Sequence, residues 1–83
     1  MVNGKTKSGF AFACEKEILD DWDFLEALTA GTAKEEIRAA KMLLGEGQLE
    51  KLKEHVRSTS GRTSFSAMDR EIGEIIQAVN GKN

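Results

Sequence analysis

The spacing of hydrophobic residues changes along the chain, from every second position near the N-terminus to helical spacing over the remainder. Phe10, Phe12 and Cys14 alternate with small side chains. This alternation is typical of a β-strand, and we predict a single strand over residues 8–14. Residues 1–7 are polar and carry a turn signal, so we expect a flexible N-terminal arm ahead of the strand.

A strand without a neighbour is a physical problem, because its backbone N–H and C=O groups need hydrogen-bond partners. The segment Gly61-Arg62-Thr63 is a candidate for pairing with the strand inside the fold. Otherwise the strand presents an open edge, to which another chain can add a strand. Self-association through this edge is therefore one hypothesis for the protein.

Beyond residue 19, apolar side chains recur every three or four positions, which predicts amphipathic helices. We place four helices, at about residues 20–30, 33–44, 48–57 and 65–80. Asp20 is the expected N-cap of the first helix, and Thr32 opens a capping box for the second. Ser64 or Ser66 is expected to cap the last helix.

The apolar stripes indicate how these helices pack. Trp22, Leu25 and Leu28 lie on one face of the first predicted helix. The last helix has the clearest stripe, formed by Phe65, Met68, Ile72, Ile75, Ile76 and Val79. Short linkers between short helices favour a compact bundle. We predict a mostly α fold, a small four-helix bundle-like domain over residues 8–83 with one short N-terminal β-strand.

Charge and composition exclude several classes of protein. The 83 residues carry a formal net charge of −2, and residues 15–30 hold six acidic side chains against one lysine. A nucleic-acid binder usually has a basic face or balance, so we expect no nucleic-acid partner. The apolar runs are too short to span a membrane, and the first residues lack the apolar run of a signal peptide. The single cysteine agrees with a reducing compartment, and we expect a cytoplasmic location.

The residues whose side chains could take part in catalysis or metal binding lack the neighbours that these functions require. His55 has no Ser or Cys nearby in the sequence to activate, and a partly exposed structural histidine is expected. Cys14 has no basic neighbour to lower its thiol pKa, which favours a buried structural role. The aspartates at 20, 21 and 23 do not fit the ligand spacing of a calcium loop. We therefore expect no enzymatic activity, no cofactor and no metal.

The order of segments is more informative than any single residue. A Phe-containing strand leads into Leu19-Asp20-Asp21-Trp22, followed by Leu43-Leu44-Gly45-Glu46-Gly47-Gln48-Leu49, Leu52-Lys53-Glu54-His55-Val56-Arg57, Gly61-Arg62-Thr63 and a final amphipathic helix. Over about residues 8–80 this order resembles the small tail assembly chaperones encoded by long-tailed bacteriophages and prophages of Gram-positive bacteria. The Leu-Leu-Gly turn carries most of the resemblance.

The resemblance implies a role in tail morphogenesis in the cytoplasm of the bacterial host. Chaperones of this class bind the long tape measure protein before the tail tube polymerises around it, and they are absent from the finished virion. It implies no cofactor, and the major tail protein is a further candidate partner. Because binding hot spots favour aromatic side chains, Phe10, Phe12, Trp22 and Phe24 are the candidate partner-binding residues. The competing interpretation places all four aromatic rings in the core.

A different class of function also fits part of the pattern. The predicted helices 33–44 and 48–57, joined by Gly45, have the order of a helix-turn-helix. In that case the basic side chains around residues 51–62 would contact phosphates of DNA. Glu46, Glu50 and Glu54 lie among those basic side chains and would repel phosphate. A small DNA-binding regulator is therefore the alternative to the chaperone.

Overall fold

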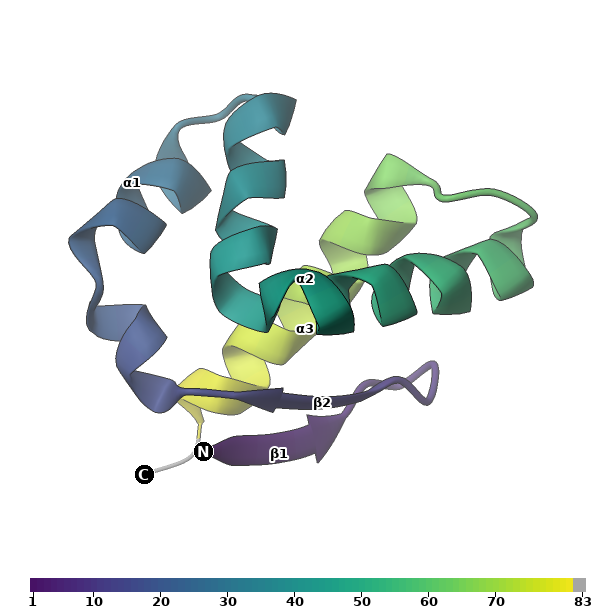
Figure 1. Cartoon of the computed structure of the whole chain (residues 1–83), viewed down its shortest axis with the longest axis horizontal. Coiled ribbons are helices and arrows are strands. Elements are labelled where there is room, and N and C mark those ends of the chain that lie inside the picture. Colours follow the sequence, from purple (N-terminus) through teal and green to yellow (C-terminus); the bar gives the residue numbers. More distant parts are fainter. Residues whose placement is uncertain (82–83) are drawn as a thin grey trace.

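The computed structural model describes residues 1–81, which form a β-hairpin followed by a set of crossing helices. The elements in chain order are β1 (Val2–Lys5), β2 (Ala11–Cys14), the 3-10 helix η1 (Lys16–Asp20), α1 (Trp22–Thr29), α2 (Ala33–Ser60) and α3 (Phe65–Asn80). The prediction of a mostly α fold is confirmed. A four-helix bundle is not found, because the helices cross one another instead of running side by side (Figure 1).

Residues 2–5 form a strand, so the prediction of a flexible arm over residues 1–7 is wrong. β1 pairs antiparallel with β2, with Val2 opposite Cys14 and Lys5 opposite Ala11. The N–H of Thr6 donates to the carbonyl of Phe10 at 2.9 Å and closes the turn between the strands. The strand predicted to be alone, over residues 8–14, is thus shorter and finds its partner in the preceding residues, not in residues 61–63.

Gly4 lies within β1 and not in a turn, and the reason is close packing. A Cβ atom at Gly4 would lie 2.7 Å from Cζ of Phe12, which is shorter than real contacts allow. The ring of Phe12 therefore lies directly over the backbone of β1 and occupies the space that a side chain would need. This contact packs the two strands of the hairpin against each other, and the burial of Phe12 joins the hairpin to the hydrophobic core.

The N-cap of the first long helix lies one residue later than predicted, and the helix buries a different face from the predicted one. Asp20 belongs to η1, and the side chain of Asp21 caps α1 by accepting from the N–H of Phe24 at 2.9 Å. Phe24 and Ala27 are fully buried, whereas Trp22 is 80% exposed. The predicted stripe through Trp22 is therefore wrong.

The predicted helices 33–44 and 48–57 are the two segments of α2, which turns sharply at Gly45. We refer to residues 33–44 as the first segment and to residues 46–60 as the second. Gly45 has φ 76° and ψ 162°, a conformation that is essentially restricted to glycine. Thr32 caps the first segment by accepting from the N–H of Glu35 at 3.3 Å, as predicted. The second segment extends to Ser60 and ends at Gly61, which adopts the left-handed conformation that commonly ends helices.

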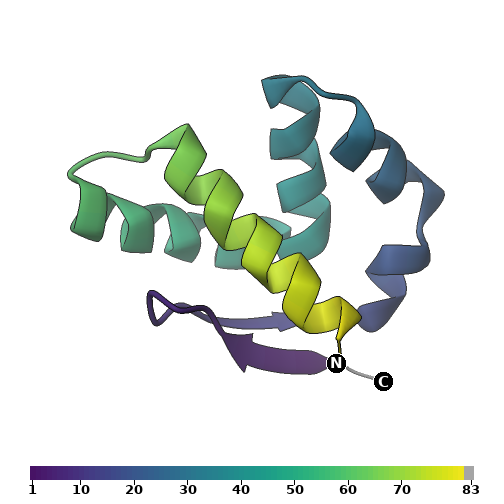
Figure 2. The same cartoon turned by 180° about the vertical axis from the view of Figure 1, so that it is seen from behind.

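α3 matches its predicted span and lies across the molecule, where it contacts both α2 and β1 (Figure 2). Ser64 is the N-cap, and it accepts from the N–H of Ala67 at 3.3 Å. Ile72, Ile75 and Val79 are buried in a core that also includes residues from β2, α1 and both segments of α2. The hairpin and the helices therefore share one hydrophobic core.

Candidate functional site

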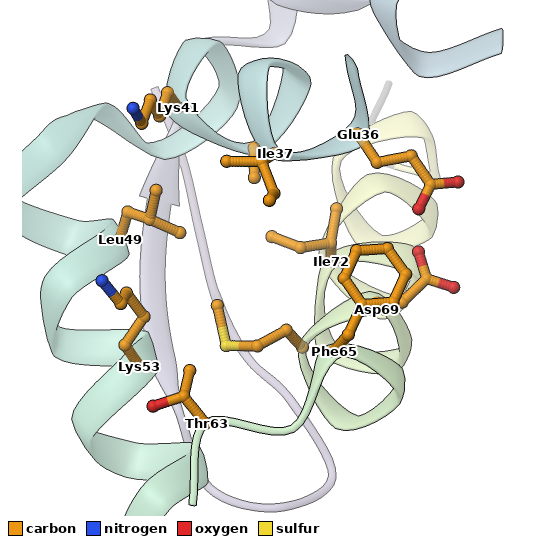
Figure 3. A pocket seen from close by; sticks show the side chains of 11 residues that line it. Glu36, Ile37, Lys41, Leu49, Lys53, Thr63, Phe65, Asp69 and Ile72 are labelled. Carbon is orange, nitrogen blue, oxygen red and sulfur yellow. The ribbon is translucent and has the colours of Figure 1, made fainter. Parts of the chain in front are cut away.

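An apolar groove lies between α3 and the two segments of α2, with a volume of about 450 Å³. Two of the large hydrophobic side chains that the fold leaves exposed, Ile37 and Phe65, line this groove, and each is 48% exposed. Figure 3 shows Ile37 at one end of the groove and Thr63 at the other. The fold thus leaves an apolar surface open at the place where three helical segments meet.

The floor of the groove is made by small and medium-sized apolar side chains from all three segments. Ala40 comes from the first segment of α2, Leu49 from the second, and Met68 and Ile72 from α3. Gly45 brings these side chains together, because the sharp turn at this residue lets the second segment leave the first at a wide angle (Figure 1). α3 packs over part of the space between the two segments and leaves the remainder open.

The charged side chains at the rim are separated by sign. Lys41 and Lys53 stand on one side of the groove, which we call the basic wall, and Glu36 and Asp69 stand on the opposite side, the acidic wall (Figure 3). Lys53 also forms an ion pair with Glu50, with 3.0 Å between Nζ and Oε2. Within residues 1–81, the other three wall residues take part in no ion pair. The rim is therefore electrically polarised across the groove.

The lining has the chemistry of a binding surface. The side chains that line the groove include no histidine, cysteine or serine that would supply a nucleophile or a general base near neutral pH. A largely apolar floor with a few charges at the edge is the usual arrangement where an amphipathic helix docks into a groove. Its volume is within the range of about 300–1,000 Å³ that is typical of ligand sites.

The four aromatic residues predicted to bind a partner do not form one surface. Phe10, Phe12 and Phe24 are buried in the core, so the prediction that they contact a partner has no support in this structure. Trp22 is exposed on the outer face of α1, one turn from the 41% exposed Leu25. Trp22 does not line the groove, and it stays a separate candidate for partner binding.

Ser8 lies beside His55 and Glu71, an arrangement that sequence spacing did not reveal. Oγ of Ser8 is 2.9 Å from Nε2 of His55 and 3.0 Å from each carboxylate oxygen of Glu71. A hydroxyl has one hydrogen, so when Ser8 donates it to Glu71, Nε2 of His55 donates to Ser8. A catalytic triad needs the histidine between the serine and the acid, accepting the hydroxyl proton. This cluster has the serine in the middle and lacks that geometry.

The same cluster attaches the hairpin turn to α3. The hydroxyl of Thr6 donates to Oε1 of the buried Glu71 at 2.7 Å, and the backbone N–H of Lys7 donates to Oε1 of Glu74 at 2.9 Å. A buried carboxylate is stable in a folded protein when its oxygens accept several hydrogen bonds. Glu71 meets this condition through Thr6 and Ser8, which indicates a structural role.

The remaining chemical candidates are the single cysteine and the side chains that could bind a metal ion. Cys14 is buried, and burial raises the pKa of its thiol above the usual value, which favours the unreactive neutral form. Within the described part of the chain, no three side chains of the metal-binding types come together. Among residues 1–81, no helix has the length and apolar character needed to cross a membrane.

The sequence did not reveal the groove, because an apolar stripe on a helix can be buried in the core or remain exposed. Phe65 was part of an apolar stripe that predicted burial, Ile37 lies at helical spacing from Ala33 and Ala40, and only the angle between the helices decides which of these side chains stays uncovered. The charges of the two walls come from positions far apart in the sequence, so no local motif marks them.

Comparison of the chain with protein-family models, with curated proteins and with solved structures found no match.

Proposed function

We propose that this protein is a tail assembly chaperone that binds the tape measure protein of a long-tailed phage or prophage, without catalysis and without a cofactor. The sequence resemblance supplies the biological role, and the groove between α2 and α3 is the observation that supports a binding mode. Its half-exposed Ile37 and Phe65 offer apolar surface to a partner. The proposal places the protein in the host cytoplasm, with the major tail protein as a further candidate partner.

The groove suits a helical partner for physical reasons. A tape measure protein of this class is long and helical, and before tube assembly it exposes apolar stripes to water. One turn of such a stripe presents side chains at spacings of three and four residues, which fit side by side between the walls of a groove. Burial of this surface on both partners lowers the free energy through the hydrophobic effect and keeps the tape measure protein from aggregating.

The test is co-expression with the tape measure protein that we expect the gene immediately downstream to encode. The variant Ile37→Gln/Phe65→Gln makes the groove polar at two half-exposed positions, so the fold is retained while the binding surface is lost. We expect the tape measure protein to move from the soluble fraction to the pellet and to stop co-purifying. The control Trp22→Gln changes an exposed aromatic residue outside the groove. Equal solubility and co-purification with the groove variant and the wild type would contradict this binding mode.

The alternative, a small DNA-binding regulator, is less well supported. The two segments of α2 are joined by a single non-helical residue, Gly45, whereas a helix-turn-helix uses a turn of three or four residues. Gel-shift experiments with duplex DNA at low salt test this alternative directly. Binding that weakens steeply as the salt concentration rises would favour it over the chaperone.

A further inference from the structure

We propose that the charge pattern of a partner helix decides the direction in which it lies in the groove, because the two walls carry opposite charge. The occupant we infer is an amphipathic helix with acidic side chains along one flank of its apolar stripe and basic side chains along the other. This inference rests on the proposed function, in which the groove binds a helix. It adds the charge pattern of that helix and the dependence of its N-to-C direction on which flank is acidic.

The two walls define a left and a right side for anything that lies along the groove. Lys41 and Lys53 line one side over the two segments of α2, and Glu36 and Asp69 line the other, from α2 and α3 (Figure 3). The apolar floor lies between them, with Ile37 and Thr63 at the two ends. A helix that lies from one end to the other therefore has one flank against each wall.

Direction follows from the geometry of a helix on a surface. When a helix keeps its apolar stripe on the floor and is turned end for end, its left and right flanks exchange places. A helix with one acidic and one basic flank thus meets opposite charges in one direction and like charges in the other. A single exposed charge pair changes an equilibrium constant by about two- to fivefold. Four wall charges acting together give a preference of about tenfold or more for one direction.

The ion pair between Lys53 and Glu50 does not remove this polarity. It joins two residues three positions apart on one helix, with 3.0 Å between Nζ of Lys53 and Oε2 of Glu50, and the side chain of Glu50 is 66% exposed whereas that of Lys53 is 39% exposed. Such pairs contribute little to stability, so Lys53 can exchange Glu50 for an acidic side chain of the partner. Lys41 on the same wall is in no ion pair within the described residues.

The experiment uses two synthetic helical peptides of identical composition, each with the same leucine stripe and with the glutamate and lysine flanks exchanged between the two. Each peptide carries a nitroxide label at its N-terminus, and broadening of the protein's amide signals reports which end of the groove the label approaches. We expect one peptide to broaden signals around Ile37 and the other to broaden signals around Thr63. Broadening of the same end by both peptides, or of both ends equally, would overturn the directional proposal.

A variant with exchanged walls gives an independent readout. In Lys41→Glu/Lys53→Glu/Glu36→Lys/Asp69→Lys, the net charge is unchanged, and each peptide should approach the end opposite to the one it approached before. The matched control Lys51→Glu/Glu26→Lys exchanges charges outside the groove and should leave both directions as in the wild type. An exchanged-wall variant that folds but keeps the wild-type directions would also overturn the proposal.

The same peptides separate this inference from the function on which it depends. Peptide binding that is lost in Ile37→Gln/Phe65→Gln, without any directional preference in the wild type, would leave the helix-binding groove intact and refute only the direction. Failure of both peptides to bind the wild-type protein would refute both proposals. Fluorescence anisotropy of the same two peptides, each with a fluorescein label in place of the nitroxide, measures this binding without reference to direction.

Discussion

The side chain of Gln48 binds the backbone of Ala13 as a neighbouring strand would. Its Oε1 accepts from the N–H of Ala13 at 2.8 Å, and its Nε2 donates to the carbonyl of the same residue at 2.8 Å. Nε2 also donates to the carbonyl of Leu44 at 2.9 Å, next to the turn at Gly45. One amide thus occupies the edge of β2 at this position and ties it to α2. At Ala13, the edge that one of our two hypotheses left open to a second chain is occupied.

Replacement of Gln48 should therefore lower the free energy of unfolding more than replacement of an exposed glutamine does. In Gln48→Ala, the N–H and C=O of Ala13 lose their partners in a partly buried place, and we expect the free energy of unfolding to fall by about 1–3 kcal/mol. Urea denaturation measures this loss, and amide exchange at Ala13 should become faster. Gln77→Ala is the control, since Gln77 is exposed on α3 and should change stability by less than about 0.5 kcal/mol. Equal stability of the two variants would show that the Gln48 contacts contribute nothing.

The aromatic residues of α1 should differ strongly in their contribution to stability. Phe24→Ala empties a fully buried position and should lower the free energy of unfolding by about 3–5 kcal/mol. Trp22→Ala removes a larger ring that is 80% exposed, and the loss should stay below about 1 kcal/mol. Denaturation curves of both variants measure the difference, and the fluorescence of Trp22 in the wild type should resemble that of tryptophan in water. A large loss for Trp22→Ala would place its ring in the core and contradict the register of α1.

The register of α1 illustrates where sequence reasoning succeeds and where it fails. The stripes of α3 and the glycine turn in α2 were predictable, because each rests on local spacing and on a residue with special backbone freedom. The buried face of α1 was not, since Trp22 and Leu25 on one side of the helix and Phe24 and Ala27 on the other are both apolar, and only the neighbouring elements decide which side is buried.

The hairpin and the groove depend on contacts that a local pattern does not contain. β1 has little hydrophobic alternation of its own, and it is a strand because β2 pairs with it and the ring of Phe12 packs over Gly4. Ile37 and Phe65 belong to apolar stripes, and whether they are covered depends on the angle that Gly45 sets between the segments of α2. Both features are products of tertiary structure.

Burial of Cys14 predicts a specific dependence of stability on pH. The pKa of this thiol is raised in the folded state, while in the unfolded chain it stays near about 8.5. Above that pH the unfolded state loses its proton first, so the free energy of unfolding falls as the pH rises, by at most about 1.4 kcal/mol per unit. The contribution of the protonated Cys14 thiol to the free energy of unfolding is fully present below a pH of about 8.5. This contribution is lost as the pH rises towards and through the folded-state pKa of Cys14.

The variant Cys14→Ala isolates this effect, because the lysines titrate alike in both proteins. Urea denaturation from pH 7 to pH 10 should show the wild type losing stability relative to Cys14→Ala only in the upper part of the range. In the same range the folded wild type should react with a thiol reagent much more slowly than the unfolded chain does. Parallel stability curves over the whole range would mean that the folded-state pKa of Cys14 is not raised.

Gly45 and Gly47 are two residues apart, and replacement of each by alanine should have opposite effects. A Cβ atom would meet no heavy atom within 4 Å at either position, so steric crowding plays no part. Gly45 has φ 76° and ψ 162°, and holding alanine there costs about 1–3 kcal/mol. Gly47 lies within the helical second segment, where alanine is favoured over glycine by about 0.5–1 kcal/mol.

We therefore expect Gly45→Ala to destabilise the protein and Gly47→Ala to stabilise it, as measured by urea denaturation. The two variants should also differ in binding, because Gly45 sets the angle at which the floor and the basic wall of the groove meet, whereas Gly47 contributes no side chain to it. Weakened peptide binding in Gly45→Ala, with unchanged binding in Gly47→Ala, would link the turn to the groove. If alanine at 45 preserved both stability and binding, α2 would be able to reach the same angle without a glycine, and the turn would not be the element that opens the groove.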